Sequence, residues 1–301
     1  MEVTVVGAGV IGLTTALALE QRGHHVRIVA AATHDGTASI TSSVAGAVWF
    51  PYRAGPAHKV TAWSARTRTW LEQLAPIREA GVDILTGYEV TNDLDPWWKD
   101  ACSITRVAAP VTGAPGSWTF VAPRCEPAIF LPWLARQLRA EIEIRQVSDL
   151  QAEPGDVVIN CTGLGAKPLL ADPELQPIQG QVLVTEPGSV DLSVTITDDR
   201  DPEQIFYVIP RRDTLVVGGI ARAWPSTEKP PIDDAITARI QQQARALGLG
   251  IGAVKAIATG LRPYRPHVRL ERTGRVIHNY GHGGAGFTMA WGCAEDVLAL
   301  L

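Results

Sequence analysis

The N-terminal residues follow the order strand, glycine-rich turn, helix, strand, and this order constrains the fold more than any other feature of the chain. Residues 2–7, EVTVVG, are a β-branched run that ends in glycine, as is typical of a buried strand. Residues 10–23 are predicted to form a helix that ends at Gly23, and residues 25–31 form the next strand. A β-α-β unit of this kind builds a parallel sheet through a right-handed crossover. The chain is therefore predicted to be an α/β protein that begins with a parallel layer.

The turn between the first strand and the helix is GAGVIG, with Gly7, Gly9 and Gly12 in G-x-G-x-x-G spacing. In such a turn the first glycine allows the tight bend, the second lets the backbone approach a pyrophosphate, and the third lets the helix pack on the strand. The helix N-terminus adds unpaired N–H groups and a partial positive charge, which favour phosphate. A glycine-rich turn can also exist without a ligand, but between a strand and a helix this motif predicts a dinucleotide site.

The second strand lacks the acidic residue that usually meets the ribose of a dinucleotide at its end. The expected position is near Ala30 or Ala31, where no carboxylate stands, and Asp35 follows a few residues later. This difference argues against an NAD-dependent dehydrogenase. It leaves open which residue contacts the ribose.

The remainder of the chain combines helices with many short strands. Helices are expected at residues 58–77, 127–142, 233–248 and 287–301, and strands at 82–92, 155–166, 180–187, 193–199, 204–221, 253–266 and 275–286. Residues 204–221 are predicted to be a hairpin turning near Arg212 and Asp213, and residues 82–92 alternate as a half-buried antiparallel strand does. A strand-glycine-helix order returns at the C-terminus. We therefore expect two interleaved domains, with the chain leaving the nucleotide domain and coming back to it.

The bulk composition argues against several classes of function. The 301 residues are 46% hydrophobic and 19% charged, as in ordinary globular proteins, and a net charge of −4 without a basic run argues against nucleic-acid binding. No apolar run reaches the roughly 18 residues of a transmembrane helix, and the N-terminus lacks the basic region of a signal peptide. The four cysteines form no CxxC pair, so we expect free thiols, no metal site and a cytoplasmic protein.

Several blocks of sequence, spread over the whole chain, carry a resemblance to a known family. The blocks are GAGVIGLTTALAL (7–19), SSVAGAVWFPY (42–52), VVINCTGLGA (157–166), LQPIQGQV (175–182), FYVIPR (206–211), LVVGGI (215–220), TGLRPYRPHVRLE (259–271) and VIHNYGHGGAGFTMAWGCA (276–294). In this order they are similar to those of the D-amino-acid oxidases, and the C-terminal block is the most specific. Members of this family are flavoenzymes that use FAD to oxidise D-amino acids to imino acids while O₂ becomes hydrogen peroxide.

The resemblance implies hydride transfer from the substrate Cα to the flavin N5, with the protein binding and orienting the substrate. Arg262 stands where the family has the arginine that binds the substrate carboxylate, and a guanidinium suits a planar carboxylate. Tyr207 matches the tyrosine whose hydroxyl also touches the carboxylate. The backbone carbonyl of Gly284 would accept the substrate amino group. No general base is needed if the amine binds neutral.

The side-chain pocket departs from the family pattern. Phe50 replaces a polar residue, Ala285 stands where vertebrate-type members have a tyrosine, and Glu203 occupies the position of a lid tyrosine found in some members. We expect Phe50, Tyr52 and Arg222 to line the pocket. Arg222 could meet an acidic substrate side chain, as in D-aspartate oxidases, or could be a solvated loop residue. A D-aspartate oxidase, a glycine or secondary-amine oxidase, and a non-catalytic flavin-binding protein therefore stay open as alternatives.

The resemblance also implies which residues hold FAD. They are Gly7, Ala8, Gly9, Val10, Ile11, Gly12, Thr41, Ser42, Ser43, Gly46, Ala47, Val48, Val147, Thr162, Gly163, Gly283, Gly284, Gly286, Phe287 and Thr288. His278, His282 and Cys293 are given structural places. The expected partners are a D-amino acid and O₂, without nucleic acid or membrane, and a homodimer is compatible with the resemblance.

The expected fold class is α/β, with two interleaved domains. A Rossmann-like FAD-binding domain takes residues 1–50, 143–180 and 259–301, and an α+β substrate domain built on an antiparallel sheet takes residues 51–142 and 181–258.

Overall fold

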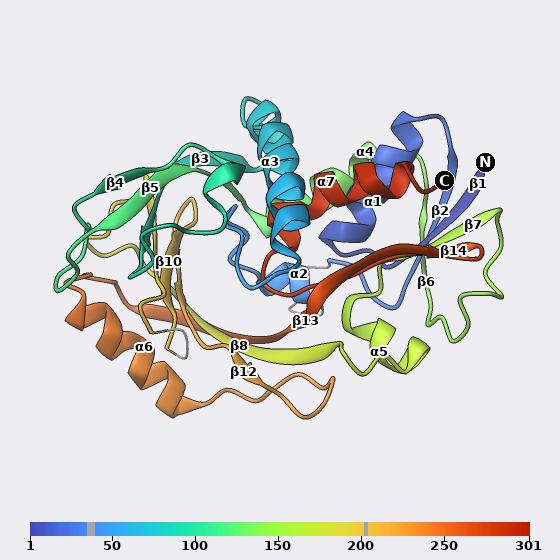
Figure 1. Cartoon of the computed structure of the whole chain (residues 1–301). Helices are drawn as coiled ribbons and strands as arrows, with labels where there is room; N and C mark the ends of the chain where they lie inside the picture. Colours follow the sequence, from blue (N-terminus) through green and yellow to red (C-terminus); the bar gives the residue numbers. More distant parts are fainter. Residues whose placement is uncertain (35–39, 202–203) are drawn as a thin grey trace. The chain divides into compact units, whose positions relative to one another are not determined.

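The computed structural model describes residues 1–34, 40–201 and 204–301, and the chain forms two compact units. Unit 1 comprises Met1–Val82, Cys125–Pro177 and Arg262–Leu301, and unit 2 comprises Asp83–Arg124 and Ile178–Leu261. The chain thus passes from unit 1 into unit 2 and back twice (Figure 1). In the ranges given above, no helix has the length and apolar character needed to span a membrane.

The sheet of unit 1 has a parallel core and an antiparallel edge. In pairing order its strands are β6 (Ile142–Ile144), β2 (His25–Ala30), β1 (Glu2–Val6), β7 (Val157–Asn160), β14 (Val276–His282) and β13 (Val254–Thr273). Every neighbouring pair is parallel except β13 with β14. Residues 254–261 of β13 belong to unit 2. The parallel pairing of β1 with β2 confirms the β-α-β unit predicted from the N-terminal sequence.

The helices of unit 1 are α1 (Val10–Gln21), α2 (Thr41–Val44), α3 (Ala57–Leu74), α4 (Pro127–Gln137), α5 (Ala166–Leu170) and α7 (Gly286–Leu298), with short 3₁₀ helices η1 (Arg78–Ala80) and η3 (Gly163–Gly165). Helices α1, α4 and α7 lie together beside the strands, whereas α5 lies apart from them (Figure 1). Helix α1 is apolar on all sides and buried along most of its length, as such a sequence requires. It ends as predicted: Gly23 has φ +80° and donates its N–H to the Glu20 carbonyl at 3.0 Å.

The sheet of unit 2 is mixed rather than purely antiparallel. In pairing order its strands are β4 (Thr105–Val107), β5 (Ser117–Cys125), β3 (Val82–Val90), β9 (Val194–Asp198), β10 (Phe206–Pro210), β11 (Leu215–Gly218) and β8 (Gln176–Thr185), and β12 (Arg222–Ala223) pairs with β8. The other elements are η2 (Lys99–Ala101) and α6 (Asp234–Ala246). The expectation that residues 82–92 form an antiparallel strand is wrong for the pairing with β9, which is parallel. The alternating burial of a strand does not reveal the direction of its partner.

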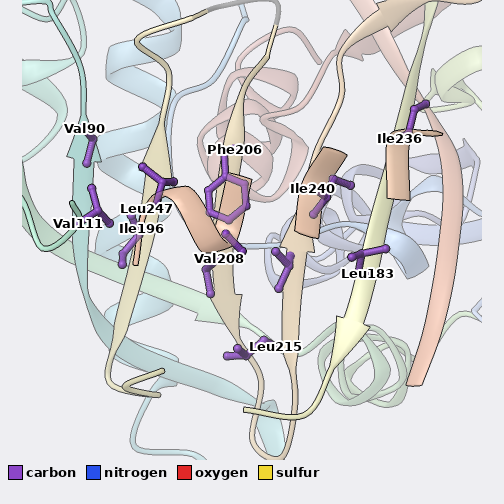
Figure 2. Close-up of a cluster of buried hydrophobic side chains, with 12 residues drawn as sticks. Val90, Val111, Leu183, Ile196, Phe206, Val208, Leu215, Ile236, Ile240 and Leu247 are labelled. Atoms are coloured by element: carbon purple, nitrogen blue, oxygen red, sulfur yellow. The ribbon is translucent and has the colours of Figure 1, made fainter. Parts of the chain in front are cut away.

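The core of unit 2 lies between this sheet and α6. Ile236 and Ile240 of the helix belong to one buried cluster with Phe206, Val208 and Leu183 of the strands (Figure 2). The Asp233 side chain caps the start of the helix, because it accepts hydrogen bonds from the N–H groups of residues 235 and 236. The hairpin of β10 and β11 also forms where expected.

The bounds of the two units differ from the domain bounds expected from the sequence. Residues 51–82 and 125–142 lie in unit 1, because the helices that they contain pack on other helices of that unit. Helix α3 packs on α7, where a Cβ at Gly292 would overlap the backbone of Trp63. The chain just after α4 is held by Glu20 of α1, whose carboxylate accepts the backbone N–H groups of residues 139 and 140 at 2.9 Å each.

Candidate functional site

The turn between β1 and α1 requires the glycines that the sequence has there. Gly7 has φ +118°, and a Cβ on it would overlap the carbonyl oxygen of Cys161. A Cβ on Gly12 would overlap the carbonyl oxygen of Gly7, and one on Gly9 would come within 3.1 Å of the Ser42 hydroxyl. The turn is therefore packed against β7 on one side and open to a small polar group on the other.

Two serine side chains hold residues 41–44 in place, Ser42 at this turn and Ser43 at His34. Ser42 Oγ accepts the backbone N–H of Val10 at 3.1 Å, at the first residue of α1. Ser43 Oγ lies 2.8 Å from Nδ1 of His34, which follows β2. The sequence analysis did not single out His34, and Asp35 lies outside the described residues. The first turn of α1 also has N–H groups without intrahelical acceptors, so hydroxyl and N–H donors converge here, as an anion requires.

A second turn, after β7, lies next to the first. Asn160 Oδ1 accepts hydrogen bonds from the backbone N–H of Thr162 at 3.2 Å and from its hydroxyl at 2.8 Å. Gly163 follows with φ +56°, and a Cβ on it would lie 4.0 Å from Cγ of Pro263. Val147 packs on the hydrophobic cluster that includes Val158 of β7. The structure therefore brings Thr162 and Gly163 to the neighbourhood of β13.

The C-terminal glycine cluster brings three of the predicted site residues together. Gly283 has φ +56° and donates its N–H to the Pro263 carbonyl at 2.8 Å. A Cβ on Gly284 would lie 2.9 Å from Cδ1 of Tyr52 and 3.5 Å from Cδ of Arg262. The side chains of Arg262 and Tyr52 therefore both lie close to the backbone of Gly284, on the side where a Cβ would point. Only glycine leaves this space open.

The two glycine clusters meet at the ends of two helices. A Cβ on Gly286, the first residue of α7, would lie 3.7 Å from Cγ1 of Val10, the first residue of α1. Next to them, the Thr288 hydroxyl accepts the N–H of Phe50 at 3.1 Å and donates to its carbonyl at 3.0 Å. Two helix N-termini side by side place two partial positive charges next to each other. This arrangement favours an extended anionic ligand over a simple core.

Contacts with neighbouring elements hold Ala47 and Phe287 in place. Ala47 has φ +56° and accepts the N–H of Cys125 at 2.9 Å, while the Phe287 ring lies 6.1 Å from that of Phe130. Ala285 is fully buried in the cluster that contains Met289 and Cys293. Its side chain therefore packs against the core-facing residues of α7.

Tyr207 and Arg222 lie in unit 2. Tyr207 pairs with Gly218 across the hairpin of β10 and β11, and its side chain is half-buried. The Arg222 guanidinium donates from Nε at 3.1 Å and from Nη2 at 2.7 Å to Oε1 of Gln179, a neutral partner. The residue is exposed on β12.

The histidines and cysteines of the site are buried and uncharged. Burial lowers the pKa of His282 to about 3, and burial together with the charge of Arg269 lowers the pKa of His278 to about 4. Burial raises the pKa of the Cys161 thiol to about 12 and the pKa of Cys293 well above its usual value. At neutral pH none of these groups is an ion, which agrees with the structural places that the sequence analysis gave to three of them.

A buried carboxylate that the sequence analysis missed supports the strands behind the site. Asp172 Oδ2 accepts the Tyr280 hydroxyl at 2.6 Å and Nε of Arg265 at 3.1 Å. Arg265 also pairs with Glu174, and its side chain fills the space at Gly281. Asp172 therefore ties β13 to β14 just before the glycine cluster. An aspartate in a stretch without periodic pattern gives no signal of such a role.

We expect Asp172→Asn to destabilise the protein by about 1–3 kcal/mol, because two buried donors lose a carboxylate acceptor. Burial alone raises the pKa of Asp172, but the bonds from Tyr280 and Arg265 hold this pKa below its usual value. The stabilisation is therefore present above the ordinary aspartate pKa of about 3.9 and is lost as pH falls through the folded-state pKa. Thermal unfolding at pH 7 and near pH 3 checks this. Glu174→Gln is the control, and equal losses in both variants at pH 7 contradict the role of Asp172.

The residues present fit a bound dinucleotide flavin. The glycine turn, the serine hydroxyl at Gly9 and the first turn of α1 suit a pyrophosphate, and the open backbone at Gly284 suits a flat ring. Among the described residues, no group of three His, Cys, Asp or Glu side chains could hold a metal ion. The glycine turns and the open backbone at Gly284 therefore suit a dinucleotide with a flat ring.

Comparisons with known proteins agree with this geometry. The family described as "FAD dependent oxidoreductase" (DAO) matches residues 2–300. The chain is 40% identical to a D-amino-acid oxidase of Rubrobacter xylanophilus, with 98% of this chain and 94% of the relative aligned. It is 39% identical to a D-amino-acid oxidase of Streptomyces coelicolor, with 99% and 96% aligned.

A solved structure shows the same fold at low identity. The dithionite-reduced L-α-glycerophosphate oxidase from Mycoplasma pneumoniae with FAD bound superposes with a TM-score of 0.79 at 17% identity, over 100% of this chain and 94% of that one. The α/β fold expected from the sequence is confirmed. The chain matches the family over nearly all residues, and its glycine turns and paired helix N-termini agree with this match. It therefore belongs to the DAO family of FAD-dependent oxidoreductases.

Proposed function

We propose that this chain catalyses the oxidative deamination of D-amino acids to 2-oxo acids and ammonia. The observation that carries the proposal is the position of Arg262, whose Cδ would lie 3.5 Å from a Cβ on Gly284, beside the adjoining N-termini of α1 and α7. A carboxylate binder thus stands next to a backbone that can approach a flat ring. The full-length similarity to two D-amino-acid oxidases supports the same reaction.

Each residue then has a separate task. FAD, held by the glycine turns of unit 1, would supply the acceptor for the hydride of the substrate Cα and the route by which the electron pair reaches O₂ to give hydrogen peroxide. Arg262 binds the substrate carboxylate through two parallel N–H bonds, and the Tyr207 hydroxyl donates a further one. The Gly284 carbonyl accepts an N–H of the neutral substrate amine, so the nitrogen lone pair can form the C=N bond as the hydride leaves. The imino acid hydrolyses after release.

The cofactor residues follow from unit 1. The Gly7–Gly12 turn with Ser42 and Ser43 would hold the pyrophosphate, and Gly283–Thr288 would hold the ring. Unit 1 would thus be the FAD-binding part, and Tyr207 and Arg222, both residues of unit 2, are the further residues proposed for the substrate. We further propose a cytoplasmic enzyme that forms a homodimer.

A panel assay tests this function. The purified protein, loaded with FAD, is given D- and L-forms of neutral, acidic and basic amino acids, together with glycine and a secondary amine, and hydrogen peroxide is measured. We expect turnover of D-forms only. Turnover of L-forms alone, or a protein that takes up no FAD, overturns the proposal. FAD uptake without any turnover favours a non-catalytic flavin-binding protein instead.

One observation favours acidic D-amino acids as a second candidate substrate class. Arg222 is exposed and its recorded partner, Gln179, is neutral, so the guanidinium can still meet a carboxylate. If it does, Arg222→Ala should lower kcat/KM for D-aspartate by about tenfold or more while leaving neutral D-amino acids nearly unchanged, since a hydrogen bond to a charged group contributes about 1.5–3 kcal/mol. The ratio of the two kcat/KM values is the measurement. An equal effect on both substrates contradicts this role.

A further inference from the structure

The Tyr207 side chain rests on a pair of glycines. A Cβ on Gly218 would come within 2.6 Å of the Tyr207 hydroxyl oxygen, and a Cβ on Gly219 within 2.8 Å of the same atom. The phenol ring and its hydroxyl therefore lie directly over the backbone of these two residues. The location of this backbone decides where the hydroxyl lies.

The second glycine of the pair is held at both its backbone groups. Its N–H donates to the carbonyl of Ile205 at 3.1 Å, at the start of the strand that carries Tyr207. Its carbonyl accepts a hydrogen bond from Nη2 of Arg239, in the middle of α6. Arg239 is partly buried, and burial lowers its pKa. Partial burial of a guanidinium costs solvation free energy, so its hydrogen bond to the Gly219 carbonyl indicates that this carbonyl is held in position.

Helix α6 also holds the backbone that precedes Tyr207. Nη1 of Arg239 donates to Oε1 of Gln243 at 3.2 Å, one turn further along α6. Nε2 of Gln243 donates to the carbonyl of Gln204 at 3.0 Å. The two side chains form one linked pair that fixes the backbone just before Tyr207 and the backbone beneath its ring.

We propose that Arg239 is a positioning residue for Tyr207. It holds the Gly219 carbonyl and so fixes the glycine pair on which the phenol lies, which places the hydroxyl for the substrate carboxylate. This inference rests on the substrate role of Tyr207 in the proposed function. It assigns to α6, which contributes no group to the reaction, the task of supporting substrate binding.

The test uses Arg239→Ala in the FAD-loaded enzyme and in the Tyr207→Phe background. We expect Arg239→Ala to raise KM for the best D-amino acid about fivefold or more with kcat changed less than about twofold, the size of effect that one lost hydrogen bond produces. In the Tyr207→Phe background the same substitution should add nothing to KM, because the hydroxyl it positions is already absent. Arg239→Lys should restore part of the binding. Arg245→Ala, exposed in the last turn of the same helix, is the matched control.

A second measurement does not depend on turnover. Benzoate carries a carboxylate but no Cα hydrogen to lose, so its dissociation constant can be taken from the change in flavin absorption. Arg239→Ala should weaken benzoate binding by the same factor as KM. If Arg239→Ala fails to fold, Arg239→Gln takes its place in both backgrounds, because it also removes the guanidinium that holds the Gly219 carbonyl, and it should raise both constants in the Tyr207 enzyme only.

Additive effects of Arg239→Ala and Tyr207→Phe overturn the inference, and so does an equal rise in KM for Arg245→Ala. An unchanged KM in Tyr207→Phe together with a raised KM in Arg239→Ala overturns it as well, because Arg239 then acts through another group. These outcomes leave the turnover of D-amino acids by the unaltered enzyme as the separate test of the proposed function.

Discussion

Replacing Arg262 with alanine should lower kcat/KM for D-amino acids at least about a hundredfold while FAD stays bound. A charge-assisted pair that is shielded from water contributes on the order of 3 kcal/mol or more, and 1.4 kcal/mol corresponds to a factor of ten. The side chain lies beside Gly284 and Tyr52, so its loss leaves the substrate carboxylate without its main partner. Steady-state kinetics with the flavin spectrum recorded on the same sample measure both quantities.

The control for Arg262→Ala is Arg272→Ala. Arg272 lies on the same strand, is exposed, and donates to the carbonyls of Gly274, Leu300 and Leu301. We expect it to change kcat/KM little. Arg262→Lys should recover only part of the loss, because an ammonium cannot make two parallel bonds. A kcat/KM in Arg262→Ala close to that of the unaltered enzyme removes the carboxylate role from this residue.

Replacing Gly7 with alanine should yield a protein that holds no FAD and folds poorly. The added Cβ would overlap the Cys161 carbonyl oxygen, and the residue has φ +118°, so both the contact with β7 and the backbone conformation are lost. The Cys161 carbonyl oxygen is a backbone atom and cannot move aside as the end of a flexible side chain could. The yield of soluble protein, its flavin absorption and its thermal unfolding midpoint measure the effect.

Gly23→Ala separates the two causes. Gly23 also has a positive φ of +80°, but nothing lies within 4 Å of an added Cβ there. We expect a loss of about 1 kcal/mol and normal FAD content, since only the left-handed conformation is penalised. If Gly7→Ala behaves like Gly23→Ala, the close packing of the glycine turn on β7 is not needed for cofactor binding.

Local patterns in the sequence predicted the parts of the fold that depend on local physics. The β-branched runs, the glycine spacing after β1 and the end of α1 at Gly23 each depend on a few neighbouring residues, and each was confirmed. The direction of β3 and the membership of α3 in unit 1 were missed. Both depend on which distant element packs on them, and periodicity gives only the buried face.

The candidate site divides in the same way. The family resemblance placed Arg262, Gly284 and Tyr52 in one site, and the structure brings these three together. Asp172 and Arg239 could not be found from the sequence, because each acts on backbone or side chains far along the chain. Charged residues of this kind look like solvated surface until the fold shows their partners. The catalytic use of the site residues stays a prediction for the experiments above.

The contact between the first residues of α1 and α7 has a consequence for how the protein is made. Val10 is synthesised long before Gly286. The strand β14, its glycine loop and α7 therefore complete the surroundings of the first glycine turn late in synthesis. A nascent chain that still lacks α7 carries the nucleotide motif without the second helix N-terminus that lies beside it in the folded protein.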